Sequence, residues 1–303
     1  MPGVAVIDCG SNSTRLLIKD HVGMQLEREL RTTRLAEGVD ASRTLTEPAI
    51  KRTIDAITEF MALVTKHGIT DLRVVATSAA RDAGNRVDFE RRVNAVTGTN
   101  LRILSGSEEG LATYRGATAG LHTPPYLVLD IGGGSTELAL GAPNAEGKQS
   151  VEAISLDIGS VRLTEQILRS DPYSPDELTN AFSLVEEMMG DASLALPVEA
   201  YQPRLIGVAG TITSVAAIDL GLTSYEPTLI HHHVLKRSAV EDLFRSLSMQ
   251  GNRERCADPT MPANRADIIV AGMIILLGVM RHFDFEESLV SETDILDGIA
   301  HPE

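Results

Sequence analysis

The sequence contains no tryptophan, and aromatic residues make up only 4% of its 303 residues. A binding site that stacks bases or sugars on aromatic rings therefore has little support in this composition. Basic residues are also scarce, since 27 Lys and Arg stand against 42 Asp and Glu, for a formal net charge of −15. Such a charge repels the phosphate backbone of nucleic acids, which argues against a general nucleic-acid-binding protein.

Cysteines and long apolar runs are scarce as well. Cys9 and Cys256 are the only cysteines, so neither a disulfide framework nor a zinc site is indicated, and a reducing cytoplasm is expected. The N-terminal segment MPGVAVIDCG lacks the basic region that is typical of a signal peptide. The longest apolar run, IIVAGMIILLGVM (268–280), is too short to span a membrane. It predicts a buried helix in which Ala271 and Gly272 allow close packing.

One sequence motif occurs twice, 122 residues apart, as IDCGSNSTRLLI (7–18) and LDIGGGSTELAL (129–140). When Asp8 is placed on Asp130, five of nine positions are identical, and both copies follow an apolar run. Around them the chain alternates between short β-branched runs and amphipathic stretches, such as a predicted helix from Glu47 to Gly68 that begins after Thr46. The pattern predicts an α/β protein in which each half opens with a hairpin.

Each copy has a strand that ends in Asp, a glycine-rich turn, and Ser-Thr at the start of a second strand. Glycines let the backbone come close to a ligand, and a turn with converging N–H groups attracts phosphate oxygens. The neighbouring carboxylate is suited to Mg²⁺, which prefers carboxylate and phosphate oxygens. The alternative is an ordinary tight hairpin, for which Gly and Asn are favoured anyway. The shared Asp, Ser and Thr, which a turn does not require, favour phosphate.

The two copies differ in charge, with Arg15 in the first where the second has Glu137. If the two loops serve one ligand, the first supplies a cation for phosphate and the second an anion for a metal ion or water. An exposed charge on a strand is the alternative for Arg15.

Seven motifs follow one another along nearly the whole chain and carry a resemblance to a known family. They are VIDCGSNSTRLLI (6–18), ATSAARDAGN (76–85), SGSEEGLATYRG (105–116), LDIGGGSTEL (129–138), LDIGSVRLTE (156–165), GVAGTITSVAAI (207–218) and NRADIIVAG (264–272). Together they resemble the exopolyphosphatase and guanosine pentaphosphate phosphatase family, within the superfamily of actin, sugar kinases and heat-shock chaperones. The block SETDILDGI departs from the commoner family form, which carries arginine where this chain has Leu296.

The resemblance implies an α/β fold of two similar actin-like (ribonuclease H-like) domains with a ligand cleft between them. We place the domains at residues 1–124 and 125–303, because TPPY (123–126) predicts a hinge. The implied reaction is hydrolysis of the terminal phosphoanhydride of inorganic polyphosphate, with release of orthophosphate. Longer relatives add a C-terminal helical extension that this chain does not show, which favours polyphosphate and shorter chains.

The resemblance also implies roles for individual residues. Glu108 is expected to be the general base, because its spacing before Asp130 favours it over Glu109; the alternative is a helix N-terminal acid favoured by the dipole. Asp130 and Glu137 are expected to hold Mg²⁺, or Mn²⁺, with Glu137 also taking part in catalysis. Arg15 and Arg81 would neutralise phosphate oxygens. The other expected substrate contacts are Asp8, Gly10, Ser11, Asn12, Ser13, Gly132, Gly133, Gly134, Ser135, Thr136 and Gly210.

Other functions remain open at this point. One is a guanosine pentaphosphate phosphatase, because guanosine pentaphosphate has the same kind of terminal anhydride as polyphosphate. A kinase or ATPase of the superfamily is disfavoured by the EEG and ATSAAR segments, and a non-catalytic nucleotide sensor by the retention of the acidic residues. The run His231 to His233 does not predict a metal site, since consecutive side chains point in different directions. A homodimer is the default expectation for the assembly.

Overall fold

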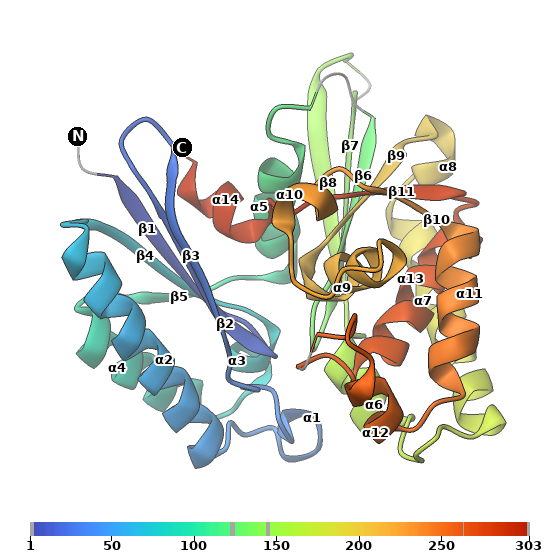
Figure 1. The fold of residues 1–303 in the computed structure, drawn as a ribbon. Helices are drawn as coiled ribbons and strands as arrows, with labels where there is room; N and C mark the ends of the chain where they lie inside the picture. Colours follow the sequence, from blue (N-terminus) through green and yellow to red (C-terminus); the bar gives the residue numbers. More distant parts are fainter. Residues whose placement is uncertain (1–2, 122–124, 144–145, 263, 302–303) are drawn as a thin grey trace. The chain divides into compact units, whose positions relative to one another are not determined.

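The computed structural model describes residues 3–121, 125–143, 146–262 and 264–301 (Figure 1). The chain forms two compact units. Unit 1 comprises residues 1–116 and 295–303, and unit 2 comprises residues 117–294. This division differs from the predicted domains 1–124 and 125–303, because the chain returns to unit 1 after residue 294 and places its last helix there. Part of the predicted hinge, residues 123–124, lies outside the described residues.

Unit 1 contains one five-stranded sheet in the order β3-β2-β1-β4-β5. The first three strands form an antiparallel meander, and β4 and β5 run parallel to β1. The strands are β1 (Val4–Cys9), β2 (Ser13–Lys19), β3 (Gln25–Thr32), β4 (Asp71–Ala76) and β5 (Leu101–Ile103). The helices are α1 (Val39–Ser42), α2 (Glu47–Lys66), α3 (Ser78–Asp82), α4 (Arg86–Thr97), α5 (Gly106–Thr118) and α14 (Ile295–Ala300).

Unit 2 contains a six-stranded sheet in the order β10-β11-β9-β6-β7-β8. Its strands are β6 (Tyr126–Ile131), β7 (Thr136–Pro143), β8 (Gln149–Leu156), β9 (Arg204–Val208), β10 (Val234–Lys236) and β11 (Glu287–Val290). Its helices are α6 (Ser160–Gln166), α7 (Pro175–Ala195), α8 (Val198–Tyr201), α9 (Ala209–Asp219), α10 (Pro227–Ile230), α11 (Arg237–Ser248), α12 (Asn252–Ala257) and α13 (Ile269–His282).

The two units repeat one topology. In each unit, the first two strands form the hairpin that carries the repeated motif, and a third strand completes an antiparallel meander. Two later strands then extend the sheet in parallel, on the other side of the first strand. Unit 2 differs by one extra antiparallel edge strand, β10. The repeat that the sequence shows over twelve residues therefore extends to the whole sheet, and the prediction of two similar α/β domains is confirmed.

Helix α2 begins and ends where the sequence predicts. The Thr46 hydroxyl accepts a hydrogen bond from the Ala49 N–H (3.3 Å), and Pro48 lies in the first turn. The helix stops before Gly68, which has a φ of +65°. A residue with a side chain would be strained in that left-handed conformation, so the glycine ends the helix.

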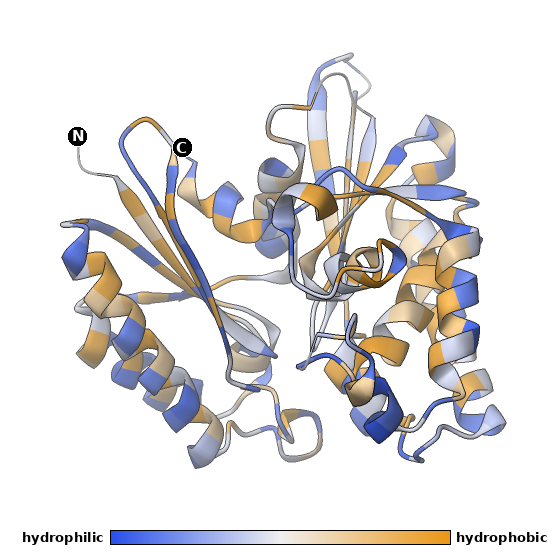
Figure 2. Ribbon diagram, viewed as in Figure 1, coloured by the Kyte–Doolittle hydropathy of each residue, from blue (hydrophilic) through white to orange (hydrophobic). Residues whose placement is uncertain are grey.

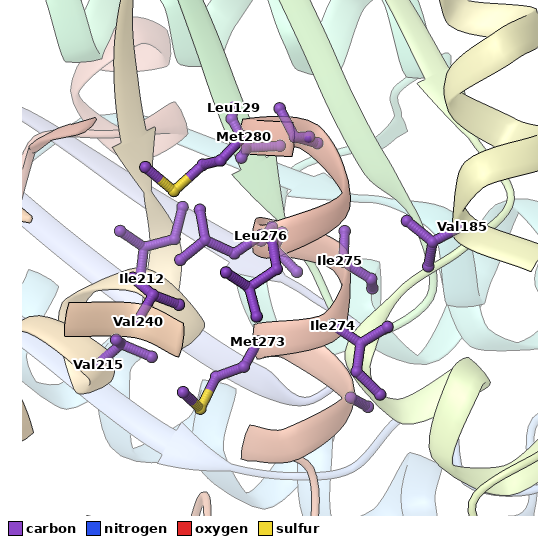
Figure 3. Close-up of a cluster of buried hydrophobic side chains, with 14 of the residues drawn as sticks. Leu129, Val185, Ile212, Val215, Val240, Met273, Ile274, Ile275, Leu276 and Met280 are labelled. Atoms are coloured by element: carbon purple, nitrogen blue, oxygen red, sulfur yellow. The ribbon is translucent and has the colours of Figure 1, made fainter. Parts of the chain in front are cut away.

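The apolar run 268–280 forms α13, the central helix of unit 2, as predicted. Figure 2 shows its hydrophobic character along most of its length. Figure 3 shows Met273 and Leu276 on the side of the helix that faces Ile212, Val215 and Val240, whereas Ile274 and Ile275 point toward Val185 of α7. The helix therefore packs on both sides, which explains why nearly all of its residues are buried.

Glycine is required within α13. A Cβ at Gly272 would overlap the side chain of Thr211 in α9. The predicted close packing at this position is thus confirmed. None of the helices in the described parts of the chain combines the length and hydropathy needed to cross a membrane.

Candidate active site

The two repeated turns have the same geometry. In the first, the Gly10 N–H donates to the Ser13 carbonyl oxygen at 3.0 Å, and in the second the Gly132 N–H donates to the Ser135 carbonyl oxygen at 3.0 Å. A Cβ on either glycine would lie 2.9 Å from the same carbonyl oxygen. That distance is too short for a side chain, so glycine at the first position of each turn is a steric requirement.

The second turn is anchored through its carbonyl oxygens. The Gly132 oxygen accepts from the Ser160 N–H (2.9 Å), and the Gly133 oxygen accepts from the N–H groups of the next two residues of α6, at 2.9 and 3.0 Å. In a trans peptide the N–H points opposite to the C=O. The N–H groups of Gly133 and Gly134 therefore point away from α6.

Gly159, which precedes α6, makes this anchoring possible. A Cβ at this position would lie 2.5 Å from the carbonyl oxygen of Gly133 and 2.7 Å from the carbonyl carbon of Gly134. Both neighbours are backbone atoms, which cannot rotate out of the way. The LDIG segment of residues 156–159 thus supports the turn, because its glycine lets the backbone of Gly133 and Gly134 come close to the start of α6.

The first turn is anchored in the same way by the segment after β3. The Ser11 oxygen accepts from the Ala36 N–H (2.9 Å), and the Asn12 oxygen accepts from the N–H groups of Thr33 (3.1 Å) and Arg34 (2.9 Å). By the same argument, the N–H groups of Asn12 and Ser13 point away from this segment. Each unit therefore presents two successive N–H groups, an arrangement that attracts phosphate oxygens.

The aspartate before each turn has a different cross-strand partner in the two units. Asp8 is paired with Arg15 in the register of β1 and β2, and Asp130 is paired with Glu137 in the register of β6 and β7. The Arg15 guanidinium donates to the Asp8 carboxylate through Nη2 at 2.6 Å and Nε at 3.1 Å. The Arg15 side chain, which was predicted to contact phosphate, is thus ion-paired with Asp8 in this structure.

In unit 2 the same pair of positions holds two acids. Asp130 is 7% exposed and Glu137 is 1% exposed. Directly opposed residues on antiparallel strands have their Cβ atoms about 4.5–5.5 Å apart and project from the same face. One Glu137 oxygen, Oε1, accepts from the Ser155 hydroxyl at 2.7 Å. Two buried carboxylates on one face repel each other when both are ionised, and a divalent metal ion would offset this repulsion, so the donor set fits such an ion.

The described residues contain no group of three or more His, Cys, Asp or Glu that could hold a metal ion. Mg²⁺ does not require one, because it commonly binds one or two carboxylates and takes its remaining ligands from water and substrate phosphates. The pair of Asp130 and Glu137 beside a phosphate-binding turn agrees with that mode of binding.

Arg81 lies in α3, directly after β4, and contacts the start of α5. Its Nη1 donates to the Leu104 carbonyl oxygen at 2.9 Å and to the Glu109 carboxylate at 3.2 Å. Glu109 is 7% exposed and lies in the first turn of α5. The structure thus brings together Arg81, which was predicted, and Glu109, which the spacing argument set aside.

Glu108, the predicted base, makes a different set of contacts. Its Oε2 accepts from the Ser105 N–H and from the Ser105 hydroxyl, both at 2.8 Å, and its Oε1 accepts from Arg102 at 2.5 Å. The Glu108 N–H donates in turn to the Ser105 hydroxyl at 3.3 Å. This reciprocal pair is a capping box at the start of α5. The side chain remains 42% exposed. These contacts match the alternative interpretation of a helix N-terminal acid.

The hydrogen bond from the Ser105 N–H, followed by that from the Arg102 side chain, lowers the pKa of the Glu108 carboxyl to about 2. A lowered pKa in the folded state stabilises the fold above the usual glutamate pKa, and this contribution is lost as the pH falls toward 2. We therefore expect Glu108→Gln to lower the melting temperature at pH 7 by roughly 1–3 °C, with turnover unchanged.

Calorimetry of both proteins at pH 7 and near pH 3 checks this expectation, since the difference between them should shrink at the lower pH. A loss of turnover without a change in melting temperature would instead support Glu108 as the base.

Gly210 lies in the first turn of α9, after a residue with a left-handed backbone, Ala209 (φ +65°). A Cβ on Gly210 would overlap the guanidinium of Arg265. Glycine at this position therefore makes room for Arg265, a residue that lies in the NRADIIVAG motif but was not singled out from the sequence.

The three consecutive histidines contact different partners. The rings of His231 and His232 are stacked at 3.8 Å, and His231 Nδ1 accepts from the Glu292 N–H at 3.1 Å. His233 Nε2 lies 2.8 Å from an Asp219 carboxylate oxygen. The first two rings thus lie side by side, whereas His233 contacts Asp219.

Comparison with known proteins identifies the family. The model of the Ppx/GppA phosphatase family matches residues 17–301. The chain is 38% identical to exopolyphosphatase 2 of Mycobacterium tuberculosis, over 98% of this chain and 97% of that protein. It is similar to the crystal structure of an exopolyphosphatase-like protein (TM-score 0.92, 32% identity, 98% and 97% of the two chains) and to that of the Aquifex aeolicus Ppx/GppA family member (TM-score 0.79, 30% identity, 98% and 95%). The repeated turns, the repeated sheet topology and these matches together show that the chain belongs to the Ppx/GppA phosphatase family.

Proposed function

We propose that the chain hydrolyses the terminal phosphoanhydride bond of inorganic polyphosphate and releases orthophosphate. The observation that carries the proposal is the pair of matched turns, each with two successive N–H groups directed away from its own anchors. Such N–H groups bind anionic oxygens directly. An acidic protein needs fixed groups of this kind, because its net negative charge repels a polyanionic substrate. The exopolyphosphatases among its relatives support the choice of substrate.

Within this proposal, the turn residues Gly10 to Ser13 and Gly132 to Thr136 hold phosphate oxygens. Asp130 and Glu137 hold Mg²⁺, or Mn²⁺, through their carboxylates. The bound ion would neutralise charge on the phosphoryl group, which is the main requirement of phosphoryl transfer. Glu137 keeps its carboxylate directed by Ser155, whose hydroxyl donates to Oε1 at 2.7 Å. Asp8 keeps Arg15 in place beside the first turn.

We propose Glu109, in place of Glu108, as the general base that orients or deprotonates the attacking water. Its carboxylate is buried and touches Arg81, a group suited to phosphate oxygens, whereas the oxygens of Glu108 are taken up by the cap of α5. Geometry decides first which acid can serve as a base. The Arg81 side chain would then fix the Glu109 carboxylate and contribute charge toward the substrate.

Phosphate release from two substrates in parallel tests the proposed function. Purified protein with Mg²⁺ is given polyphosphate or guanosine pentaphosphate at equal concentrations of terminal anhydride, with Asp130→Asn as the control for contaminating phosphatases. We expect faster release from polyphosphate. Faster release from guanosine pentaphosphate would favour the second phosphatase activity, and binding of either compound without release would favour a nucleotide sensor.

The ligand cleft between the two domains, the cytoplasmic location and the homodimer all stay predictions. Small-angle scattering with and without polyphosphate addresses the first and the last of these, because closure changes the profile and dimerisation changes the mass.

A further inference from the structure

Helix α14 completes unit 1 although it follows unit 2 in the sequence. Leu296 and Ala300 pack against Val6 of β1 and Leu17 of β2. Val6 is two residues before Asp8 on the same strand, so both project from the same face of the sheet. Leu296, where the commoner family form carries arginine, thus fills an apolar contact in this chain, and α14 covers the face from which Asp8 projects.

Polar contacts fix α14 across three strands. The Asp297 carboxylate, 3% exposed, lies 2.8 Å from Lys19 Nζ of β2 and also pairs with Arg28 of β3. Burial alone would raise the pKa of this carboxyl, but the charges of Arg28 and Lys19 outweigh it, and the pKa lies below its usual value. At the other end of the helix, Arg73 of β4 donates to the carbonyl oxygens of Ile299 (2.5 Å) and His301 (3.1 Å).

The same helix touches α5 through backbone atoms. A Cβ at Gly298 would overlap the carbonyl oxygen of Ala112 in α5 and would lie 2.6 Å from its carbonyl carbon. No side-chain rotation can relieve such an overlap. Ile295 and Ala112 also belong to one buried apolar cluster, together with Val75 and Leu104. Ala112 is three residues after Glu109, which is less than one helical turn.

We propose that α14 is a positioning element for Glu109, with Gly298 and Asp297 as its positioning residues. The sheet holds α14 through Asp297 and Arg73. Helix α14 in turn fixes how closely α5 approaches it, through the contact of Gly298 with Ala112. These contacts together fix the position of the Glu109 carboxylate relative to the sheet face that carries Asp8. The inference rests on the proposed role of Glu109.

Gly298→Ala tests the inference directly, because the added methyl group must push α5 away from α14. We expect kcat to fall roughly 10- to 100-fold, the size of effect that a displacement of about 1 Å produces, while KM stays near its original value. Gly190→Ala is the matched control, since a Cβ at Gly190 in α7 meets nothing within 4 Å, and its kcat should not change.

A double-mutant cycle separates positioning from a general loss of stability. If α14 acts through Glu109, Gly298→Ala should lower kcat in the original protein but have almost no further effect in the Glu109→Gln protein. Independent losses that multiply in the double variant would overturn the inference. If Gly298→Ala does not fold, Asp297→Asn takes its place in the cycle, because it removes the charge and keeps the number of heavy atoms.

The cycle also keeps the two proposals apart. Full turnover by Glu109→Gln alone would overturn the proposed base, whatever Gly298→Ala does. A large loss in Glu109→Gln together with an unchanged kcat in Gly298→Ala would leave the proposed function in place and overturn only the positioning by α14.

Discussion

Glu109→Gln is expected to lower kcat for phosphate release by roughly 10²–10⁴-fold, the usual contribution of a general base. Glutamine keeps the length of the side chain and can still accept a hydrogen bond from Arg81, which lies 3.2 Å from the carboxylate. It cannot take a proton from water. Substrate affinity should hold or improve, because a negative charge near a polyanion is removed. Steady-state phosphate release from polyphosphate gives both kcat and KM.

Glu108→Gln is the matched control for this expectation, because the two residues are adjacent and only Glu108 belongs to the capping box. It should leave kcat nearly unchanged. The reverse pattern, with turnover abolished in Glu108→Gln and intact in Glu109→Gln, would return the role to the residue that the spacing argument chose. If both variants keep full turnover, Glu137 is the next candidate.

Removal of divalent metal is expected to abolish turnover. Asp130 and Glu137 are buried and opposed in the strand register, and phosphate oxygens do not approach two carboxylates without a cation. EDTA should stop phosphate release, and Mg²⁺ or Mn²⁺ added in excess should restore it. Full activity in metal-free buffer would contradict the assignment of these two residues.

Glu137→Gln adds a second measurement that does not depend on turnover. Loss of one ligand should weaken binding of Mn²⁺, followed by electron paramagnetic resonance, by at least about 10-fold. Asp8→Asn is the corresponding change at the first turn. The Asp8 carboxylate is already paired with Arg15, so we expect a much smaller effect on Mn²⁺ binding there. Equal effects of both changes would mean that the first turn also holds the metal ion.

Features that depend on local chemistry could be predicted from the sequence. The repeated hairpins, the start of α2 at Thr46 and the buried helix α13 follow from glycine, capping and apolar patterns over a few residues. The choice between Glu108 and Glu109 could not be made from their spacing to Asp130. The pattern S-x-x-E at Ser105 would have identified a capping box, and therefore a structural reason for Glu108.

Other features depend on contacts between residues far apart in the sequence. The pairing of Arg15 with Asp8 follows from strand register, which the sequence alone does not fix. The proline pair in TPPY predicts a single domain boundary at residue 124, whereas the chain crosses between the units twice. The return of α14 to unit 1 is set by contacts such as Asp297 with Lys19, 278 residues apart by their numbers, and no local pattern signals it.

The return of α14 also has a consequence for the order in which the chain can fold during synthesis. Unit 2 is one continuous segment, inserted between the two parts of unit 1. All of its residues have been made before α14 leaves the ribosome, and domains generally fold as units in order of synthesis. Val6 and Leu17 of unit 1 stay uncovered until Leu296 and Ala300 of α14 have been made. Unit 1 is therefore expected to complete its folding after unit 2, although its first strands are made earlier.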